Sequence, residues 1–378
     1  MNRRRFLSTS VAALSTRYLA FDAVSQTAHG SSSLDPSLGT KAVASLEKGL
    51  AYLKISQRPE GFWSTADYPG LTSLVIQAFA GAPDRKHRGS GTVREGLKFI
   101  RKSAKPDGGI YNKGLSNYNT SIAVSTLILA GDQSDKELIE AGRKFLIGAQ
   151  RKNSSPSSND GGFGYEAGGS GNQSRPDLDN TVFTLEAFAL YREANRRAET
   201  PGQADLNWKA AIEFISRCQN LKETNPESWA SDEPAEKGGF TYTPRGDDKG
   251  THSYGTMTYA GLLSLIYADV KKNDPRVQAA VDWLSRHYTL EENPGQGQQG
   301  LYYYYFVMAK GLATAGIDTL STADGKTVNW RDELTKKLLS LQKPDGSWSN
   351  ETGRWMEKDP VLVTSYVVLA LNYLCKRT

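Results

Sequence analysis

The sequence predicts an all-α fold, an α6/α6 toroid (barrel) built from six helical-hairpin repeats. Three observations predict this fold. A short helical pattern recurs along the 378 residues, a glycine-rich turn follows its copies, and a more apolar helix follows each turn. Recurrence of one supersecondary unit is typical of repeat architectures, because a single hairpin cannot bury its apolar face alone.

The first helix of each repeat carries a small residue, then an aromatic residue three positions later and an aliphatic residue four positions later. Residues three and four apart share one helical face, so each copy predicts an amphipathic helix. The copies lie at residues 49–53, 96–100, 142–146, 211–215 and 280–284, with a weaker sixth copy at 334–339.

The second helix of each repeat is expected after a turn in which glycine permits a positive φ. The turns lie at residues 60–63, 107–109, 160–163, 237–240 and 345–348, with a degenerate one at 294–297. The helices that follow hold few charges, which predicts burial on most sides. They lie at residues 71–80, 120–130, 181–190, 256–268, 301–315 and 362–374. Six such hairpins can close into a double ring, although an open solenoid fits the same repeats.

The N-terminal segment resembles an export signal. Arg3 and Arg4 precede a variable residue and then Phe6-Leu7, as in the twin-arginine motif. We therefore expect a signal over residues 1–30, a linker over 31–40, a toroid domain over 41–378, and a periplasmic or cell-envelope location. The alternative is a disordered basic N-terminus of a cytosolic protein.

Charge, hydropathy and cysteine usage narrow the expected partners. The formal charge is +5; residues 1–30 hold four arginines and one aspartate, so they contribute +3 and the remainder +2. This balance gives little reason to expect nucleic acid as a partner. The absence of a long apolar run predicts no transmembrane helix and leaves peripheral membrane contact open. Cys218 and Cys375 form no CxxC pair, and the four histidines are scattered, so neither a metal site nor a cofactor is expected.

Two turns carry a family resemblance. The segments Gln57 to Trp63 and Gln342 to Trp348 both read Q-x3-G-x-W. They resemble the QW motif of squalene and oxidosqualene cyclases, in which the glutamine and the tryptophan tie neighbouring hairpins together. The Gly-Gly-Phe turns resemble those of prenyltransferase β subunits. The resemblance covers residues 41–374 and implies the toroid, whereas it says little about chemistry, since fold does not fix function.

A second resemblance concerns a candidate acid. Class II members of the cyclase family use a D-x-D-D-T-A motif, and the segment that begins at Asp177 reads D-L-D-N-T-V. The resemblance places Asp179 on the proton donor and Asp177 on the first aspartate. Asn180 and Val182 depart from the motif. His252, at the start of another inner helix, takes the place of the histidine that supports the donor in bacterial cyclases.

A carbocation formed by such an acid needs aromatic walls, since π faces attract cations. The expected substrate-binding residues are Tyr165, Tyr254, Tyr302, Tyr305 and Asn180. The run of tyrosines at 302–305 scatters around a helix, so two of the four are expected to face the interior. The ligand implied is a hydrophobic small molecule, and no protein partner is identified.

Simpler interpretations stay open for the same residues. Aspartate ahead of a helix is a common N-cap, so Asp179 is also expected to cap its helix. A helix N-terminus favours the ionised carboxylate, which opposes a proton donor. His252 also fits an ordinary rim position. Besides an acid-initiated cyclase or isomerase, the sequence allows a non-catalytic toroid that binds a ligand or partner, and more weakly a polysaccharide-active enzyme with two carboxylates across a cavity.

Overall fold

The computed structural model describes residues 34–153, 157–167, 174–195, 205–244 and 252–375. The segment expected to be an export signal, residues 1–30, lies outside these residues. The first helix, α1 (Pro36–Ile55), begins within the stretch expected to be a linker. It starts there because the Asp35 carboxylate accepts hydrogen bonds from the amides of Ser37 and Leu38, and Pro36 suits the first helical position.

Outer and inner helices alternate along the described part of the chain, as the sequence predicts. The outer helices are α1, α3 (Gly91–Lys102), α5 (Lys136–Ala149), α7 (Trp208–Arg217), α9 (Pro275–Arg286) and α11 (Trp330–Ser340). The inner helices are α2 (Pro69–Ala80), α4 (Ser116–Ala130), α6 (Leu178–Asn195), α8 (Gly255–Tyr267), α10 (Leu301–Ala315) and α12 (Pro360–Leu374).

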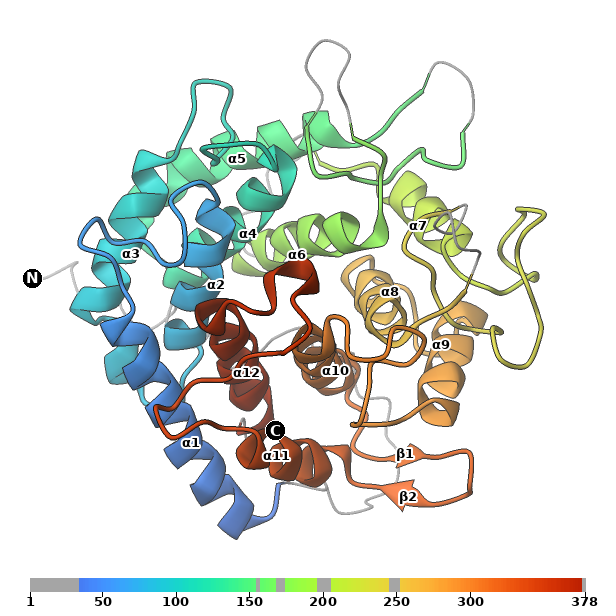
Figure 1. Cartoon of the computed structure of the whole chain (residues 1–378). Helices are drawn as coiled ribbons and strands as arrows, with labels where there is room; N and C mark the ends of the chain where they lie inside the picture. The colour runs from blue at the N-terminus through green and yellow to red at the C-terminus, as the bar shows by residue number, and fades with distance from the viewer. Residues whose placement is uncertain (1–33, 154–156, 168–173, 196–204, 245–251, 376–378) are drawn as a thin grey trace, which may run out of the picture.

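The inner helices close into a ring (Figure 1). Each of them packs against the next, from α2 through α4, α6, α8 and α10 to α12, and α12 packs back against α2. The first outer helix, α1, lies against α11 and α12, so the first and last hairpins meet at one seam. The α/α toroid is therefore confirmed, and the open solenoid is excluded.

The repeated small residue has a packing role that joins consecutive hairpins. A Cβ atom on Gly96 of α3 would lie 3.0 Å from the ring of Trp63, which belongs to the preceding turn. At the seam, a Cβ on Gly49 of α1 would lie 3.1 Å from the ring of Trp348. The turn glycines approach just as closely: Gly346 has a φ of +89°, and a Cβ there would lie 2.6 Å from a backbone oxygen of α1. Only small residues allow this approach between a turn and the next outer helix.

In four of the repeats, one glutamine connects the turn to the next outer helix. The Gln57 side-chain amide donates to the carbonyl of Gly61 in its own turn and to that of Thr92 at the start of α3, both at 3.0 Å. Gln342 does the same with Gly346 at 3.0 Å and with Ser45 of α1 at 2.9 Å. The sequence motif identifies these two. The structure adds Gln150 and Gln219, which make the equivalent pairs of bonds.

Five turns are also fixed to the inner helix that follows them. In each, a backbone amide of the turn donates to the hydroxyl of a buried threonine on that helix. The pairs are Trp63 with Thr72, Ile110 with Thr120, Phe163 with Thr181, Phe240 with Thr258 and Trp348 with Thr364, all at 2.9–3.1 Å. These bonds satisfy amides that would otherwise be buried without a partner.

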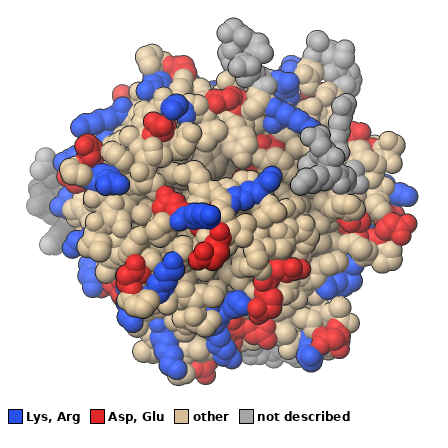
Figure 2. Space-filling view, in the orientation of Figure 1, with Lys and Arg blue, Asp and Glu red and all other residues tan. Residues whose placement is uncertain are grey.

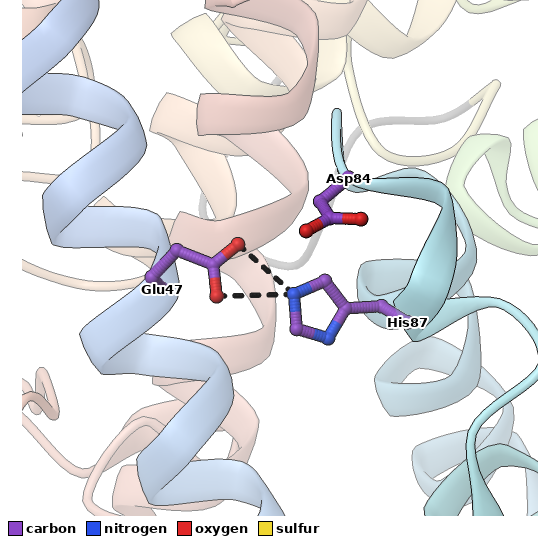
Figure 3. Close-up of side chains that lie close together, drawn as sticks. All are labelled: Glu47, Asp84 and His87. Atoms are coloured by element: carbon purple, nitrogen blue, oxygen red, sulfur yellow. Dashed lines mark hydrogen bonds and ion pairs between the residues drawn. The ribbon is translucent and has the colours of Figure 1, made fainter.

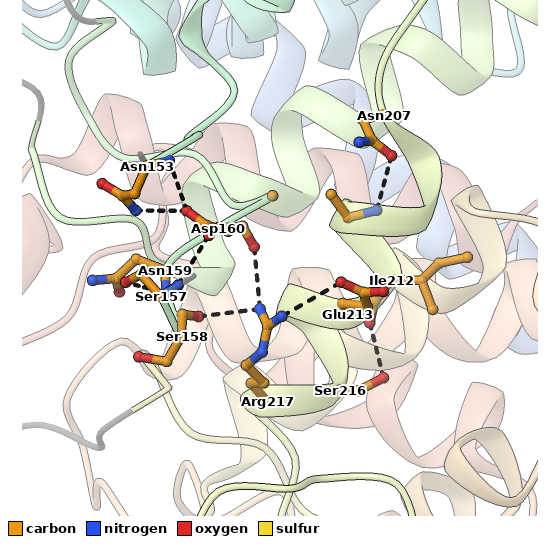
Figure 4. A network of polar contacts seen from close by, with 12 residues as sticks. Asn153, Ser157, Ser158, Asn159, Asp160, Asn207, Ile212, Glu213, Ser216 and Arg217 are labelled. Atoms are coloured by element: carbon orange, nitrogen blue, oxygen red, sulfur yellow. Dashed lines mark hydrogen bonds and ion pairs between the residues drawn. The ribbon is translucent and has the colours of Figure 1, made fainter. Parts of the chain in front are cut away.

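The long third turn is stabilised by polar contacts to α7 (Figure 4). The Asp160 carboxylate accepts from the backbone and side chain of Asn153 and from the amide of Ser157. The Arg217 guanidinium on α7 donates to the backbone carbonyls of Asp160 and Ser158 at 3.2 and 3.4 Å. A small hairpin that the sequence did not predict, β1 (Leu320–Ser321) paired antiparallel with β2 (Thr327–Val328), connects α10 to α11.

The described helices give no candidate membrane span, because none combines the length and the hydropathy that a bilayer crossing needs. On the face shown in Figure 2, Lys and Arg side chains are interspersed with Asp and Glu side chains. That face therefore shows no field of one sign that would favour a polyanionic partner.

Candidate functional site

The site is built around the first turn of α6, and Asp177 caps that helix. The Asp177 carboxylate accepts from the amide of Asn180 at 2.8 Å, and its backbone carbonyl accepts from the amide of Thr181 at 3.1 Å. This is the hydrogen-bond pattern of an N-cap residue. The expectation that Asp179 provides the cap is therefore wrong by two positions, and its carboxylate is available for another interaction.

The Asp179 carboxylate instead meets a tyrosine from across the ring. The Tyr303 hydroxyl on α10 donates to its Oδ1 atom at 2.5 Å. Burial raises the pKa of Asp179 to about 6, and the bond from Tyr303 acts in the opposite direction. Burial, together with the neighbouring charge of Asp179, holds the pKa of Tyr303 well above its usual value of 10. Tyr303 therefore remains a protonated donor.

A buried glutamate fixes the position of Tyr303. One oxygen of Glu357 accepts from the Tyr303 amide at 2.8 Å, and the other accepts from the Asn350 side chain at 2.6 Å. Glu357 is fully buried, and burial raises its pKa. An acidic side chain at the start of α10 also complements the positive end of that helix. Tyr303 is thus held at its backbone by Glu357 and at its hydroxyl by Asp179.

Asp177 is a second carboxyl group with a raised pKa. Its side chain is buried, and burial raises its pKa to about 8. The hydrogen bonds from the Asn180 amide and side chain lower that pKa, whereas the nearby Asp179 raises it. The Asn180 side-chain amide therefore donates to the aspartate that caps α6, at 2.8 Å from Asp177 Oδ2.

Six aromatic side chains form a continuous group beside Asp179, here called the aromatic cluster. Its members come from α4, the third turn, α6, α10 and α12, and each lies within 6.4 Å of another between ring centroids: Tyr118, Tyr165, Phe183, Tyr303, Phe306 and Tyr366. Phe183 stacks against Tyr303 at 6.4 Å, and Phe306 stacks against Tyr366 at 5.9 Å. Their π faces create the electron-rich surroundings in which a cation is stabilised.

The structure brings together only part of the residue set proposed from the sequence. Asp177, Asp179 and Asn180 lie together at the start of α6, and Tyr165 belongs to the aromatic cluster beside them. Burial first, and then the two nearby aspartates, raise the pKa of the Tyr165 hydroxyl. His252 is exposed, and its Nδ1 atom lies 2.9 Å from Glu236.

The other three proposed tyrosines lie at the starts of α8 and α10. Tyr254 is the residue before α8. Tyr302 and Tyr305 pack edge to face at 5.8 Å, and the Tyr305 hydroxyl donates to the Leu290 carbonyl. The member of the tyrosine run that meets Asp179 is Tyr303.

A periodic signal for the interior positions was present in the sequence. Asp179, Phe183 and Glu186 are spaced i, i+4, i+7 on α6. Tyr303, Phe306 and Lys310 are spaced i, i+3, i+7 on α10. Both spacings define one helical face. The first residues of the two faces, Asp179 and Tyr303, contact each other. The last residues, Glu186 and Lys310, also contact each other, with Lys310 Nζ 2.5 Å from Glu186 Oε2.

A separate group of potential metal ligands lies between α1 and the segment after α2 (Figure 3). One ligand atom each from Glu47, Asp84 and His87 falls within 4.8 Å of the others, and this donor set suits zinc. Each side chain already has a partner: His87 Nε2 lies 2.9 and 3.0 Å from the two Glu47 oxygens, and Asp84 pairs with Lys86 at 2.7 Å. These contacts account for the group as a connection between α1 and the segment after α2.

A cleft of about 530 Å³ lies where α1 ends and α12 begins. Tyr52, Arg58, Met356 and Asp359 are among its lining residues, and Asp359 is the one carboxylate among them. Asp359 also caps α12, by accepting from the Val361 amide at 2.9 Å. Among the described residues, this cleft therefore lacks the second carboxylate that glycoside hydrolysis requires.

Comparison with solved structures places this fold among toroidal enzymes of several kinds. A complex of the type II terpene cyclase MstE from Scytonema with its product, merosterolic acid A, is similar with a TM-score of 0.55 and 13% identity over 90% of this chain and 98% of that one. Protein geranylgeranyltransferase-I from Candida albicans, complexed with GGPP, is similar with a TM-score of 0.50 and 14% identity over 87% and 90%. The GH76 α-mannanase of Bacteroides thetaiotaomicron is similar with a TM-score of 0.57 and 11% identity over 89% and 98%.

No protein-family model and no curated protein sequence matches the chain. The structural similarities show the fold, which terpene cyclases and prenyltransferases share with a glycoside hydrolase. The resemblance noted in the turns is thereby confirmed at the level of architecture. The chemistry must be argued from the site itself.

Proposed function

We propose that this protein is a cofactor-independent, acid-initiated cyclase or isomerase of an isoprenoid-like substrate, with Asp179 as the acid. The observation that carries the proposal is the Asp179–Tyr303 hydrogen bond, made by a carboxyl group with a raised pKa at the edge of the aromatic cluster. A general acid must be protonated at the working pH and yet must release its proton readily. Burial supports the first requirement, and the Tyr303 hydroxyl supports the second, since it stabilises the carboxylate that remains.

The chemical step is a proton transfer to carbon. The π electrons of a terminal alkene take the Asp179 proton to form a C–H bond, which leaves a carbocation on the neighbouring carbon. The next alkene attacks this cation. The final cation loses a proton to solvent water, which gives a neutral product, and the Asp179 carboxylate takes a proton from solvent before the next turnover. The faces of Phe183, Tyr303 and Tyr366 would stabilise the positive charge during these steps.

Asp177 has a positioning role in this proposal. It caps α6 through the Asn180 amide, and its carboxyl group, with a pKa of about 8, adds little negative charge beside Asp179 at neutral pH. A charged neighbour would raise the pKa of Asp179 further and weaken it as an acid. His252 has no part in this step, because its partner is Glu236.

The test is incubation of the full chain with a panel of polyprenoids that includes alcohols such as farnesol as well as hydrocarbons such as squalene, followed by mass-spectrometric analysis of products. The expected result is a cyclised or isomerised product that Asp179→Asn no longer forms. Asp359→Asn is the matched control, since Asp359 stands at the start of α12 and caps it. That variant should keep the activity.

Two results would overturn the proposal. Asp179→Asn could turn over the substrate at the wild-type rate, which would remove Asp179 from the reaction. Alternatively, the wild-type chain could bind a polyprenoid in calorimetry and leave it unchanged, which would favour the non-catalytic binding toroid.

A further inference from the structure

A buried ion pair crosses the ring interior two helical turns below Asp179. Lys310 Nζ on α10 lies 2.5 Å from Glu186 Oε2 on α6, and the two side chains are 7% and 9% exposed. Glu186 follows Asp179 by seven residues, as Lys310 follows Tyr303. Seven residues of α-helix rise about 10 Å. The two polar pairs are therefore at two depths of the same interior, with the aromatic cluster between and beside them.

Helix packing connects α6 to α10 independently of this ion pair. In the inner ring α8 lies between α6 and α10 and packs against both of them, as Figure 1 shows. Removing two charges from water costs several kcal/mol for each ion, and apolar replacements of buried pairs are often neutral or stabilising. A ligand is therefore a better explanation than stability for burying this pair.

The pair has hydrogen-bonding capacity beyond its mutual contact. An ammonium group has three donors, and in the described part of the chain Glu186 is the one acceptor that Lys310 reaches. A carboxylate has two acceptor oxygens, and the bond to Lys310 uses one of them. The Phe306 ring lies on another side of the ammonium, with its centroid 5.3 Å from Lys310 Nζ. A ligand group that both donates and accepts, such as a hydroxyl, would bind to both members of the pair.

Charge balance restricts the ligand further. The Glu186–Lys310 pair is neutral overall, and the aromatic cluster adds no charge. A diphosphate would bring several negative charges into a buried site whose lysine is already paired, and uncompensated buried charge is strongly unfavourable. A pure hydrocarbon would leave the free donors and acceptor of the pair without partners, which is also unfavourable.

Building on the proposed function, we propose that Glu186 and Lys310 bind the head group of the substrate. The geometry assigns this head group as one uncharged oxygen function, a hydroxyl or a carbonyl. The reactive alkene of the same prenyl chain then lies at Asp179, about 10 Å away along the inner helices. The substrate class is an oxygenated isoprenoid, rather than a prenyl diphosphate or a hydrocarbon such as squalene.

Calorimetric titration with three probes of equal carbon number tests this assignment: farnesol, farnesene and farnesyl diphosphate. The titrations use Asp179→Asn, so that no turnover consumes the ligand and binding is measured whether or not the wild-type protein is a cyclase. Farnesol should bind at least about tenfold more tightly than either of the others, since unmet buried polar groups discriminate strongly between ligands. Equal affinities for farnesol and farnesene, or no binding of any probe, would overturn the assignment.

Two further variants in the same background isolate the pair. The double change Glu186→Met with Lys310→Met removes both charges together, so the protein should keep its melting temperature and lose the preference for farnesol over farnesene. Glu186→Gln leaves Lys310 uncompensated, so the affinity for farnesyl diphosphate should rise about tenfold relative to farnesol.

Glu291→Gln is the control for these variants, because it alters an exposed ion pair with Lys337 and should change none of the affinities. A farnesol preference that survives the double change would show that the pair does not bind the head group. Failure of the cyclase proposal would look different, because the wild-type protein would bind farnesol with the predicted preference and release it unchanged.

Discussion

The Tyr303 hydroxyl lies 2.5 Å from the Asp179 carboxylate although 124 residues and an intervening inner helix separate the two. The same separation of 124 residues joins Lys310 to Glu186. The interior face of α10 is therefore in register with that of α6 over two turns. This register brings an acid, a donor to that acid and an aromatic cluster into one place.

Tyr303→Phe should move the pH dependence of turnover. Asp179 is active as the protonated acid, so activity should fall as pH rises through its pKa of about 6. The Tyr303 bond lowers that pKa, so its loss should shift the alkaline limb to higher pH and slow turnover by about 10-fold to 100-fold. Tyr305→Phe is the control, because its hydroxyl bonds to Leu290. An unchanged alkaline limb in Tyr303→Phe would show that Tyr303 does not influence the pKa of the catalytic acid.

The assignment of the α6 cap predicts a difference between two variants of one residue. Both Asp177→Asn and Asp177→Ala remove the carboxyl group, but only asparagine keeps an acceptor for the Asn180 amide. Asp177→Ala should therefore be less stable than Asp177→Asn by about 1 kcal/mol in urea unfolding. The corresponding pair at Asp179 should differ by much less. Equal stabilities of the two Asp177 variants would contradict the cap.

The raised pKa values of Asp177 and Asp179 predict that their contribution to stability declines as pH rises. Asp177 and Asp179 have folded-state pKa values of about 8 and about 6, above the ordinary value of 3.8. At these two positions the folded protein therefore binds more protons than the unfolded chain. The stabilisation that the two carboxyl groups provide is complete below about pH 4 and is lost as pH rises through 6 and then 8. Urea titrations between pH 5 and 8.5 measure this slope. Asp177→Asn should flatten its upper part and Asp179→Asn its lower part; slopes unchanged in both variants would refute the shifted pKa values.

Replacing the glutamine at the seam should reduce the free energy of unfolding more than replacing an exposed glutamine. Gln342 joins the last turn to Ser45 of α1, so Gln342→Leu leaves two backbone carbonyls without their donor and should cost about 1–3 kcal/mol. Gln278→Leu alters an exposed side chain and should stay within about 0.5 kcal/mol of the wild type. Denaturant unfolding compares the two, and equal small losses would show that the seam does not depend on Gln342.

Export is a proposal that rests on the N-terminal residues alone. Residues 1–30 fused to a folded reporter should carry it across the cytoplasmic membrane of a bacterium with a twin-arginine pathway. Arg3→Lys together with Arg4→Lys should leave the reporter in the cytoplasm. Export that persists in this double variant would refute the twin-arginine assignment.

The sequence predicted the helices and their order because the necessary information is local. An aromatic residue three positions after a small one, and a glycine at the end of a helix, determine helical faces and turns within a few residues. The Q-x3-G-x-W segments likewise identified two of the four glutamine connections. Gln150 and Gln219 were missed because the glycines that they bond to, Gly161 and Gly238, lie well beyond the Q-x3-G spacing and no tryptophan follows them, although the hydrogen bonds are equivalent.

The composition of the site could be predicted only in part. The sequence pointed to Asp177 and Asp179, yet it gave the cap to Asp179 because helix starts are uncertain by a residue or two. It chose Tyr302 and Tyr305 rather than Tyr303, because the rotation of α10 about its axis depends on packing against α8 and α12. His252 was favoured by its spacing along the chain, whereas its fold position directs it to Glu236.

The sequence by itself therefore determined the repeat, the hairpins and the apolar character of the inner helices, since these depend on residues close together in the chain. The tertiary structure decided that the ring closes, that Asp179 meets Tyr303 and that Glu186 meets Lys310. Those contacts join residues far apart in sequence. Their geometry depends on how far each helix is rotated about its axis and shifted along it within the ring. Side-chain packing between neighbouring hairpins sets that rotation and height, and no short segment of the chain contains this information.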